Sequence, residues 1–63
     1  MSAKVIALLD EARSNHRKAA LCLALAATSG DEVQIVAATD AHEQAAVILV
    51  SAILQRMVAK EGA

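Results

Sequence analysis

The sequence has no aromatic residue and no proline, and it has only two glycines. Aromatic rings give a small core much of its buried area, so alanine and the aliphatic residues must form any core here. Alanine favours helices strongly but buries little surface. The chain has 63 residues, which is close to the lower size limit for independent folding. These absences predict one small helical domain that is marginally stable as a monomer.

Cysteine and long apolar runs are also scarce. Cys22 is the only cysteine, which excludes a disulfide within the chain and predicts a cytoplasmic protein. The net charge is −1, so nothing attracts the whole chain to nucleic acid or to acidic membranes. The longest uncharged runs, 19–30 and 44–55, are shorter than the ~20 apolar residues of a membrane span. We therefore expect no transmembrane span.

Helical periodicity continues on both sides of Gly30. Ser2 is a suitable cap for the first helix, and a glycine suits the left-handed residue that ends one. The letters DEVQ after Gly30 match a capping box, with Asp31 as the cap and Gln34 reaching back. The fold class predicted is all-α. It is a two-helix antiparallel hairpin in a single domain, 1–63, with helices at about 2–28 and 32–61 and a turn at 29–31.

The second helix leaves two alternatives open. Asp40 and Glu43 match a further capping box, so the helix has a possible break near Asp40. The segment 33–39 is rich in β-branched residues and is the one credible strand, although a lone strand would have no partner within the chain. We prefer a helix to a strand at 33–39, and the break near Asp40 stays open. If the helix is unbroken, a heptad reading predicts a core seam of Val33, Val36, Asp40, Glu43, Val47, Val50, Leu54 and Met57.

Each predicted helix has a polar interruption, at 13–18 and at 39–44. Folding the chain at Gly30 brings the two interruptions together. We expect them to form one polar layer that fixes the register of the hairpin, as buried polar groups do in coiled coils. The residues predicted for this layer are Asn15, His16, His42 and Glu43.

The segment 45–54 reads AAVILVSAIL and carries no charge. On a helix its large side chains fall on several sides, whereas one neighbouring helix covers only one side. Exposed apolar surface of this kind marks an interface. We therefore predict a homodimer with a four-helix bundle core. The residues predicted for the interface are Val5, Leu8, Leu9, Val47, Ile48, Val50, Ile53, Leu54 and Met57.

The sequence offers no credible catalytic or metal site. His16, His42 and Cys22 lack the i, i+3 or i+4 spacing of ligands on one helix, and a thin hairpin has no deep pocket. We expect no cofactor, no metal and no enzymatic activity. The function predicted is a small non-enzymatic protein–protein interaction module, acting as an adaptor, inhibitor or assembly protein. Its expected partners are a copy of itself and another protein.

Two other functions stay open. Arg13, Arg17 and Lys18 form a basic cluster on the first helix, which suits contacts to phosphate groups. They support a dimeric nucleic-acid-binding regulator as an alternative, although the acidic second helix argues against nucleic acid as the partner. The segment 45–54 also suits a peptide that lies in the interface of a membrane.

Overall fold

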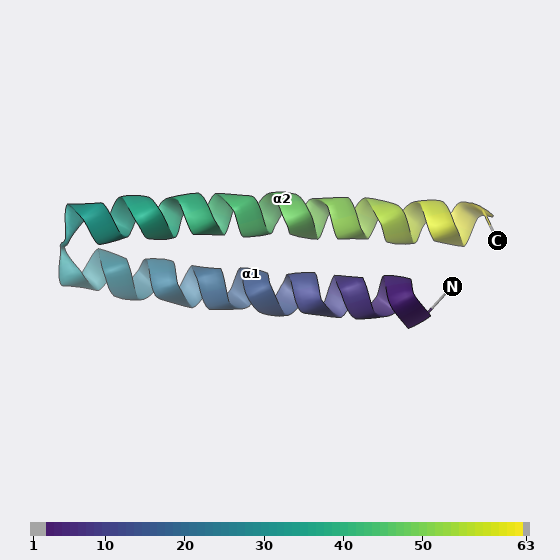
Figure 1. Ribbon diagram of the computed structural model, residues 1–63, viewed down its shortest axis with the longest axis horizontal. Coiled ribbons are helices and arrows are strands. Elements are labelled where there is room, and N and C mark those ends of the chain that lie inside the picture. The colour runs from purple at the N-terminus through teal and green to yellow at the C-terminus, as the bar shows by residue number, and fades with distance from the viewer. Residues whose placement is uncertain (1–2, 63) are drawn as a thin grey trace.

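The protein is an antiparallel hairpin of two long helices. A computed structural model describes residues 3–62, and Ser2, the predicted first cap, lies outside them. Helix α1 spans Ala3–Ser29 and helix α2 spans Glu32–Gly62. The helices lie side by side along their whole length, with both chain ends at the same end of the hairpin (Figure 1). The all-α two-helix prediction is confirmed, and the described residues contain no strand.

The turn between the helices consists of Gly30 and Asp31. Gly30 has a φ of +72°, a left-handed conformation that costs other residues energy, as expected for the residue that ends a helix. Asp31 caps α2, because its Oδ1 accepts hydrogen bonds from the backbone N–H groups of Val33 at 3.0 Å and Gln34 at 3.3 Å. The reciprocal half of the predicted capping box is absent. The Asp31 N–H instead donates to Ser29 Oγ at 3.2 Å.

Helix α2 is continuous through residues 39–44, so neither the break near Asp40 nor the strand at 33–39 forms. No proline or glycine interrupts this stretch, and each residue within an unbroken helix keeps its backbone hydrogen bonds. The hydroxyl of Thr39 also stays within the helix, where it donates to the carbonyl oxygen of Ile35 at 2.7 Å. Asp40 therefore lies within α2 and does not cap a helix.

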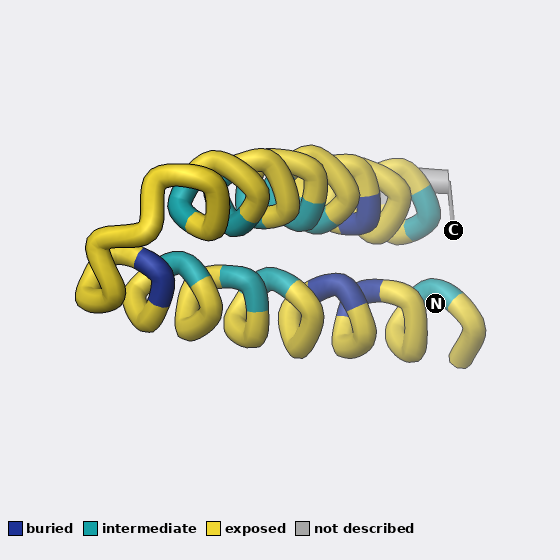
Figure 2. The backbone as a smooth tube through the Cα atoms, turned by 60° about the vertical axis from the view of Figure 1, so that its left-hand side comes forward, coloured by how far each residue is buried: buried dark blue, intermediate teal, exposed yellow. Residues whose placement is uncertain are grey.

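The interface between the helices is built mainly from small side chains. Its most buried residues are Leu9 at 3% exposure and the three alanines Ala12, Ala26 and Ala52. Leu49 packs against Leu9, Ala12 and Ala52, whereas Ala26 is buried nearer the turn. The buried and half-buried positions of each helix face the other helix (Figure 2). Small side chains let two helix axes approach closely, so this seam holds the hairpin together without burying much apolar area.

The seam on α2 differs from the predicted one by two residues. It follows heptad spacing through the half-buried or buried Ile35, Ala38, His42, Ala45, Leu49 and Ala52. Two residues correspond to a rotation of about 200° on a helix, so the predicted seam faces away from α1. Burying the predicted seam would also have placed Asp40 and Glu43 inside the hairpin without partners, which is costly. The alanine seam leaves both acids in water.

Candidate interaction surface

The face of α2 turned away from α1 carries an apolar stripe that Asp40 and Glu43 interrupt. We call this the outer stripe, and it consists of Val33, Val36, Asp40, Glu43, Val47, Val50, Leu54 and Met57. Its six apolar side chains are between 53 and 79% exposed. Asp40 and Glu43 are exposed as well. The large apolar residues of the chain thus lie mostly outside the hairpin, while alanines fill its inside.

The nine residues predicted for the interface fall in three places. Val47, Val50, Leu54 and Met57 belong to the outer stripe. Leu8, Ile48 and Ile53 are exposed beside it, and Leu8 and Ile48 line one groove that both helices form. Leu9 packs between the helices, and Val5 is half-buried. The buried Leu9 is therefore part of the hairpin core and offers no surface to a partner.

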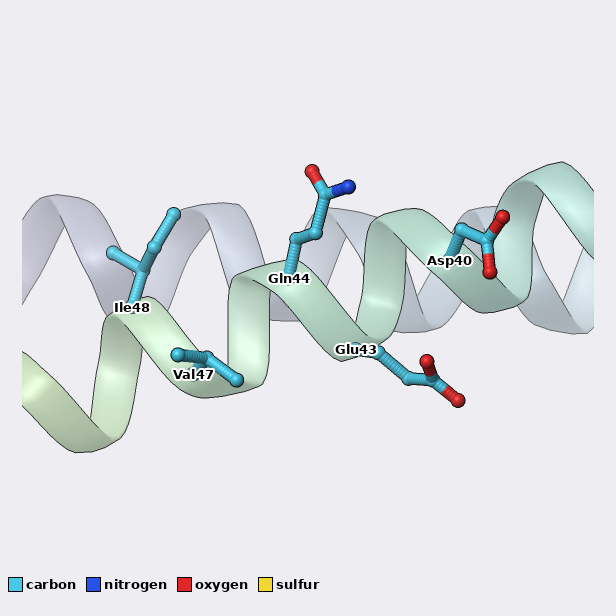
Figure 3. Close-up of a pocket in the computed structure, with 5 residues that line it drawn as sticks. All are labelled: Asp40, Glu43, Gln44, Val47 and Ile48. Atoms are coloured by element: carbon cyan, nitrogen blue, oxygen red, sulfur yellow. The ribbon is translucent and has the colours of Figure 1, made fainter.

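A shallow depression interrupts the middle of the outer stripe (Figure 3). All five of its lining residues come from α2: Asp40, Glu43, Gln44, Val47 and Ile48. The side chains of Glu43 and Gln44 point to different sides of the helix, so they do not converge on one point. A depression walled by one helix does not enclose a small molecule, because binding pockets bury most of their ligand.

Charged side chains stand on different faces of α2. Asp40 and Glu43 are exposed on the outer stripe and form no ion pair with any described residue. Arg56 and Lys60 lie beside Met57, where they line a groove together with Arg13 of α1. This groove lies between the helices, and Arg56 continues the spacing of the seam, four residues after Ala52, so Arg56 is not part of the outer stripe.

The polar layer forms only in part. The rings of His16 and His42 lie with their centroids 4.8 Å apart and their planes tilted by 40°, and both residues are half-buried in the helix seam. Asn15 and Glu43 are exposed and stay out of this contact. Both lie next to a seam position along the chain, which turns their side chains about 100° away from the neighbouring helix. The layer is thus a pair of imidazoles.

The basic cluster of α1 is fully on the surface. Arg13, Arg17 and Lys18 are exposed, and none of them forms an ion pair with a described residue.

Within residues 3–62, no three histidine, cysteine or acidic side chains gather closely enough to hold a metal ion. The described helices also contain no stretch that is both long and apolar enough to cross a membrane.

The sequence matches no protein-family model, no curated protein and no solved structure. Function is therefore inferred from the surface of the hairpin itself. Sequence analysis assigned no role to Arg56 and Lys60, which line a groove between the helices together with Leu9 and Arg13.

Proposed function

We propose that the protein is a small non-enzymatic protein–protein interaction module that acts as a helical homodimer. The observation that carries this proposal is the exposure of large apolar side chains. The seam between α1 and α2 alternates alanines with a few larger residues such as Leu9 and Leu49, whereas six large apolar side chains on the outer stripe face solvent. Apolar surface removed from water contributes about 25 cal/mol per Å², so covering the outer stripe is strongly favoured.

The hairpin has the dimensions of an assembly unit. Its principal extents are 48 × 14 × 11 Å, and it is only two helices wide. A second hairpin on the outer stripe covers Val47, which lines one groove together with Leu8 and Ile48. The α1 side of that groove, with Leu8, stays on the surface, which supports a role as an adaptor, inhibitor or assembly protein.

Sedimentation equilibrium tests the homodimer directly. The 6.5 kDa chain is expected to sediment as a particle of twice that mass at micromolar concentration. Leu54→Asp places a charge in the outer stripe and is expected to abolish the dimer. Leu21→Asp is the matched control, because Leu21 is also exposed, at 66%, but lies on α1. The control is expected to keep the dimer mass.

Two results would overturn the proposal. One is a stable helical monomer at micromolar concentration, because the outer stripe would then need no partner. The other is steeply salt-dependent binding of RNA or DNA that is lost in a chain carrying Arg13→Ala and Arg17→Ala. That result would replace protein interaction by nucleic-acid binding as the function of the hairpin.

A further inference from the structure

We infer that His16 and His42 form a two-imidazole site that binds one divalent ion of the zinc and copper class between α1 and α2. The two rings come from different helices, and their centroids lie 4.8 Å apart. The sequence predicted no metal site, because neither histidine has a second ligand at helical spacing on its own helix. The site lies in the seam of one hairpin and does not depend on a second copy of the chain.

The separation of the two rings matches that of imidazoles that bind one ion together. Bonds of about 2.0–2.1 Å from the ion to each ring nitrogen, at an angle of about 90–110°, put the ring centroids ~4.5–5.2 Å apart. The 4.8 Å between His16 and His42 lies within this range. Rotation about the Cβ–Cγ bond turns the ring nitrogens but leaves the centroid almost in place, and this torsion has broad energy minima. The hairpin therefore already holds the two rings at a chelating distance.

The ring nitrogens of both histidines are free to bind an ion. Neither side chain forms a hydrogen bond or an ion pair with another residue in the described part of the chain. Both residues are half-buried, so an ion reaches the rings from solvent without opening the hairpin. Neutral imidazole is the commonest metal ligand among side chains, and it suits zinc, copper and nickel. These properties favour an ion of that class over calcium or magnesium, which prefer oxygen ligands.

The seam around the pair is lined by small side chains. Each histidine has one alanine about a turn before it and one about a turn after it along the seam: Ala12, Ala19, Ala38 and Ala45. Their methyl groups leave space beside the rings for water molecules that complete the coordination of the ion. The described residues supply no third protein ligand at this place. The site is therefore open, unlike the four-ligand sites of structural zinc, and its ion exchanges with solvent.

The exposed charges beside the pair nearly cancel. Arg17 directly follows His16, and Glu43 directly follows His42, so each helix places one charge next to its own ring. The other charges near this level are also exposed: Arg13, Lys18 and Asp40. Water and salt screen charges on exposed side chains strongly. The small excess of basic residues therefore opposes binding of a cation only weakly.

Titration with zinc tests the site. Isothermal titration calorimetry of the unmodified chain, at about pH 7.5 where metal and proton compete little for imidazole, is expected to give one zinc ion per chain. His16→Gln and His42→Gln are each expected to raise the Kd for zinc roughly tenfold or more, because the remaining imidazole loses the second ligand held beside it. Zinc at ~10 times the Kd is expected to raise the Tm by about 5 °C, since the ion binds the folded hairpin.

The matched control exchanges two neighbouring residues, with Ala41→His and His42→Ala in one chain. Its composition is unchanged, but the moved imidazole is turned by about 100° around α2 to an exposed position. This chain is expected to bind zinc as weakly as the single variants. Cys22→Ser is expected to bind zinc like the unmodified chain, because Cys22 lines a different groove nearer the turn. Far-UV circular dichroism verifies that each variant stays helical.

Four results would overturn the site. Zinc at about 1 mM that neither binds to the unmodified chain nor raises its Tm would show that the pair is no ligand set. Equally tight binding by the exchanged chain would show that the two rings do not act together. Loss of binding in Cys22→Ser would assign the ion to the thiol. One ion for every two chains would mean that zinc bridges hairpins, whereas failure of the chain to dimerise leaves this site intact and overturns only the proposed function.

Discussion

Two neighbouring residues determine where the chain reverses. Gly30 supplies the left-handed backbone that ends α1, and nothing lies within 4 Å of the position its Cβ would occupy. Glycine is therefore favoured at this position because it adopts a positive φ without strain, and not because a larger side chain would clash with a neighbour. Asp31 then satisfies two N–H groups that have no partner within α2. Both roles were readable from the sequence, because they depend only on local backbone chemistry.

Asp31→Ala removes this cap and leaves the N–H groups of Val33 and Gln34 to water. We expect the free energy of unfolding to fall by about 1 kcal/mol, the usual cost of losing a helix cap. Urea denaturation followed by circular dichroism at one fixed protein concentration measures the change. Asp31→Asn keeps an accepting oxygen and is expected to lose much less. Equal losses in the two variants would show that charge matters here and the hydrogen bonds do not.

At the scale of the helices, the sequence predicted the number, length and direction of the elements. It did not predict which face of α2 meets α1. Both candidate faces have heptad spacing, and hydrophobicity favours the one with Val47, Val50 and Leu54. The face that the hairpin buries carries several alanines. Small side chains let the axes of two helices approach closely, and this gain depends on the partner helix. Periodicity in one helix carries no information about that partner.

The contact between His16 and His42 also shows that the sequence did not predict which side chains face the partner helix. The sequence placed the two polar interruptions together, but it grouped His16 and His42 with Asn15 and Glu43. In the hairpin only the imidazoles meet, at 4.8 Å between ring centroids. One residue along a helix turns a side chain by about 100°, so neighbours in the sequence do not share the seam. The role of the pair in setting the register stays a prediction.

Replacing both imidazoles tests what the pair contributes. A chain with His16→Leu and His42→Leu fills the same layer with apolar side chains that need no hydrogen-bond partner. We expect the free energy of unfolding to rise by about 1 kcal/mol, because polar groups half-buried in a seam lose some hydration. Urea denaturation at matched concentration provides the measurement. Asn15→Leu, on the exposed side of α1, is the control and is expected to change stability little. A less stable double variant would mean that the contact between the rings is favourable.

At the scale of the whole molecule, the hairpin is too thin to have an interior. No described side chain is less than 2% exposed, and the buried set is one leucine and three alanines. A two-helix unit of this length has most of its atoms at the surface, so its own burial stabilises it only weakly. Exposed apolar surface was predictable from the uncharged segment 45–54, whereas the face of α2 that carries it required the orientation of that helix.

Thermal stability is therefore expected to depend on protein concentration. Dimer formation stabilises the folded chain by mass action, and a hundredfold rise in concentration adds about 2.7 kcal/mol. For two chains of this size that corresponds to a rise in Tm of about 10 °C. Melting curves recorded by circular dichroism at about 2 µM and about 200 µM measure this change in Tm. The Leu54→Asp chain is expected to lose this dependence, and a Tm of the unmodified chain that does not move would contradict it.

Gly30 also determines the topology of anything built from this chain. The hairpin departs from helical backbone only at Gly30 and Asp31 within residues 3–62. If residue 30 took helical dihedral angles, α1 and α2 would join into one rod of about 90 Å, at 1.5 Å per residue. The two halves of each rod would then pair with the halves of other rods, exchanging arms between chains without a natural end. In the proposed homodimer, the turn at Gly30 and Asp31 is therefore what keeps both helices of a hairpin within one chain.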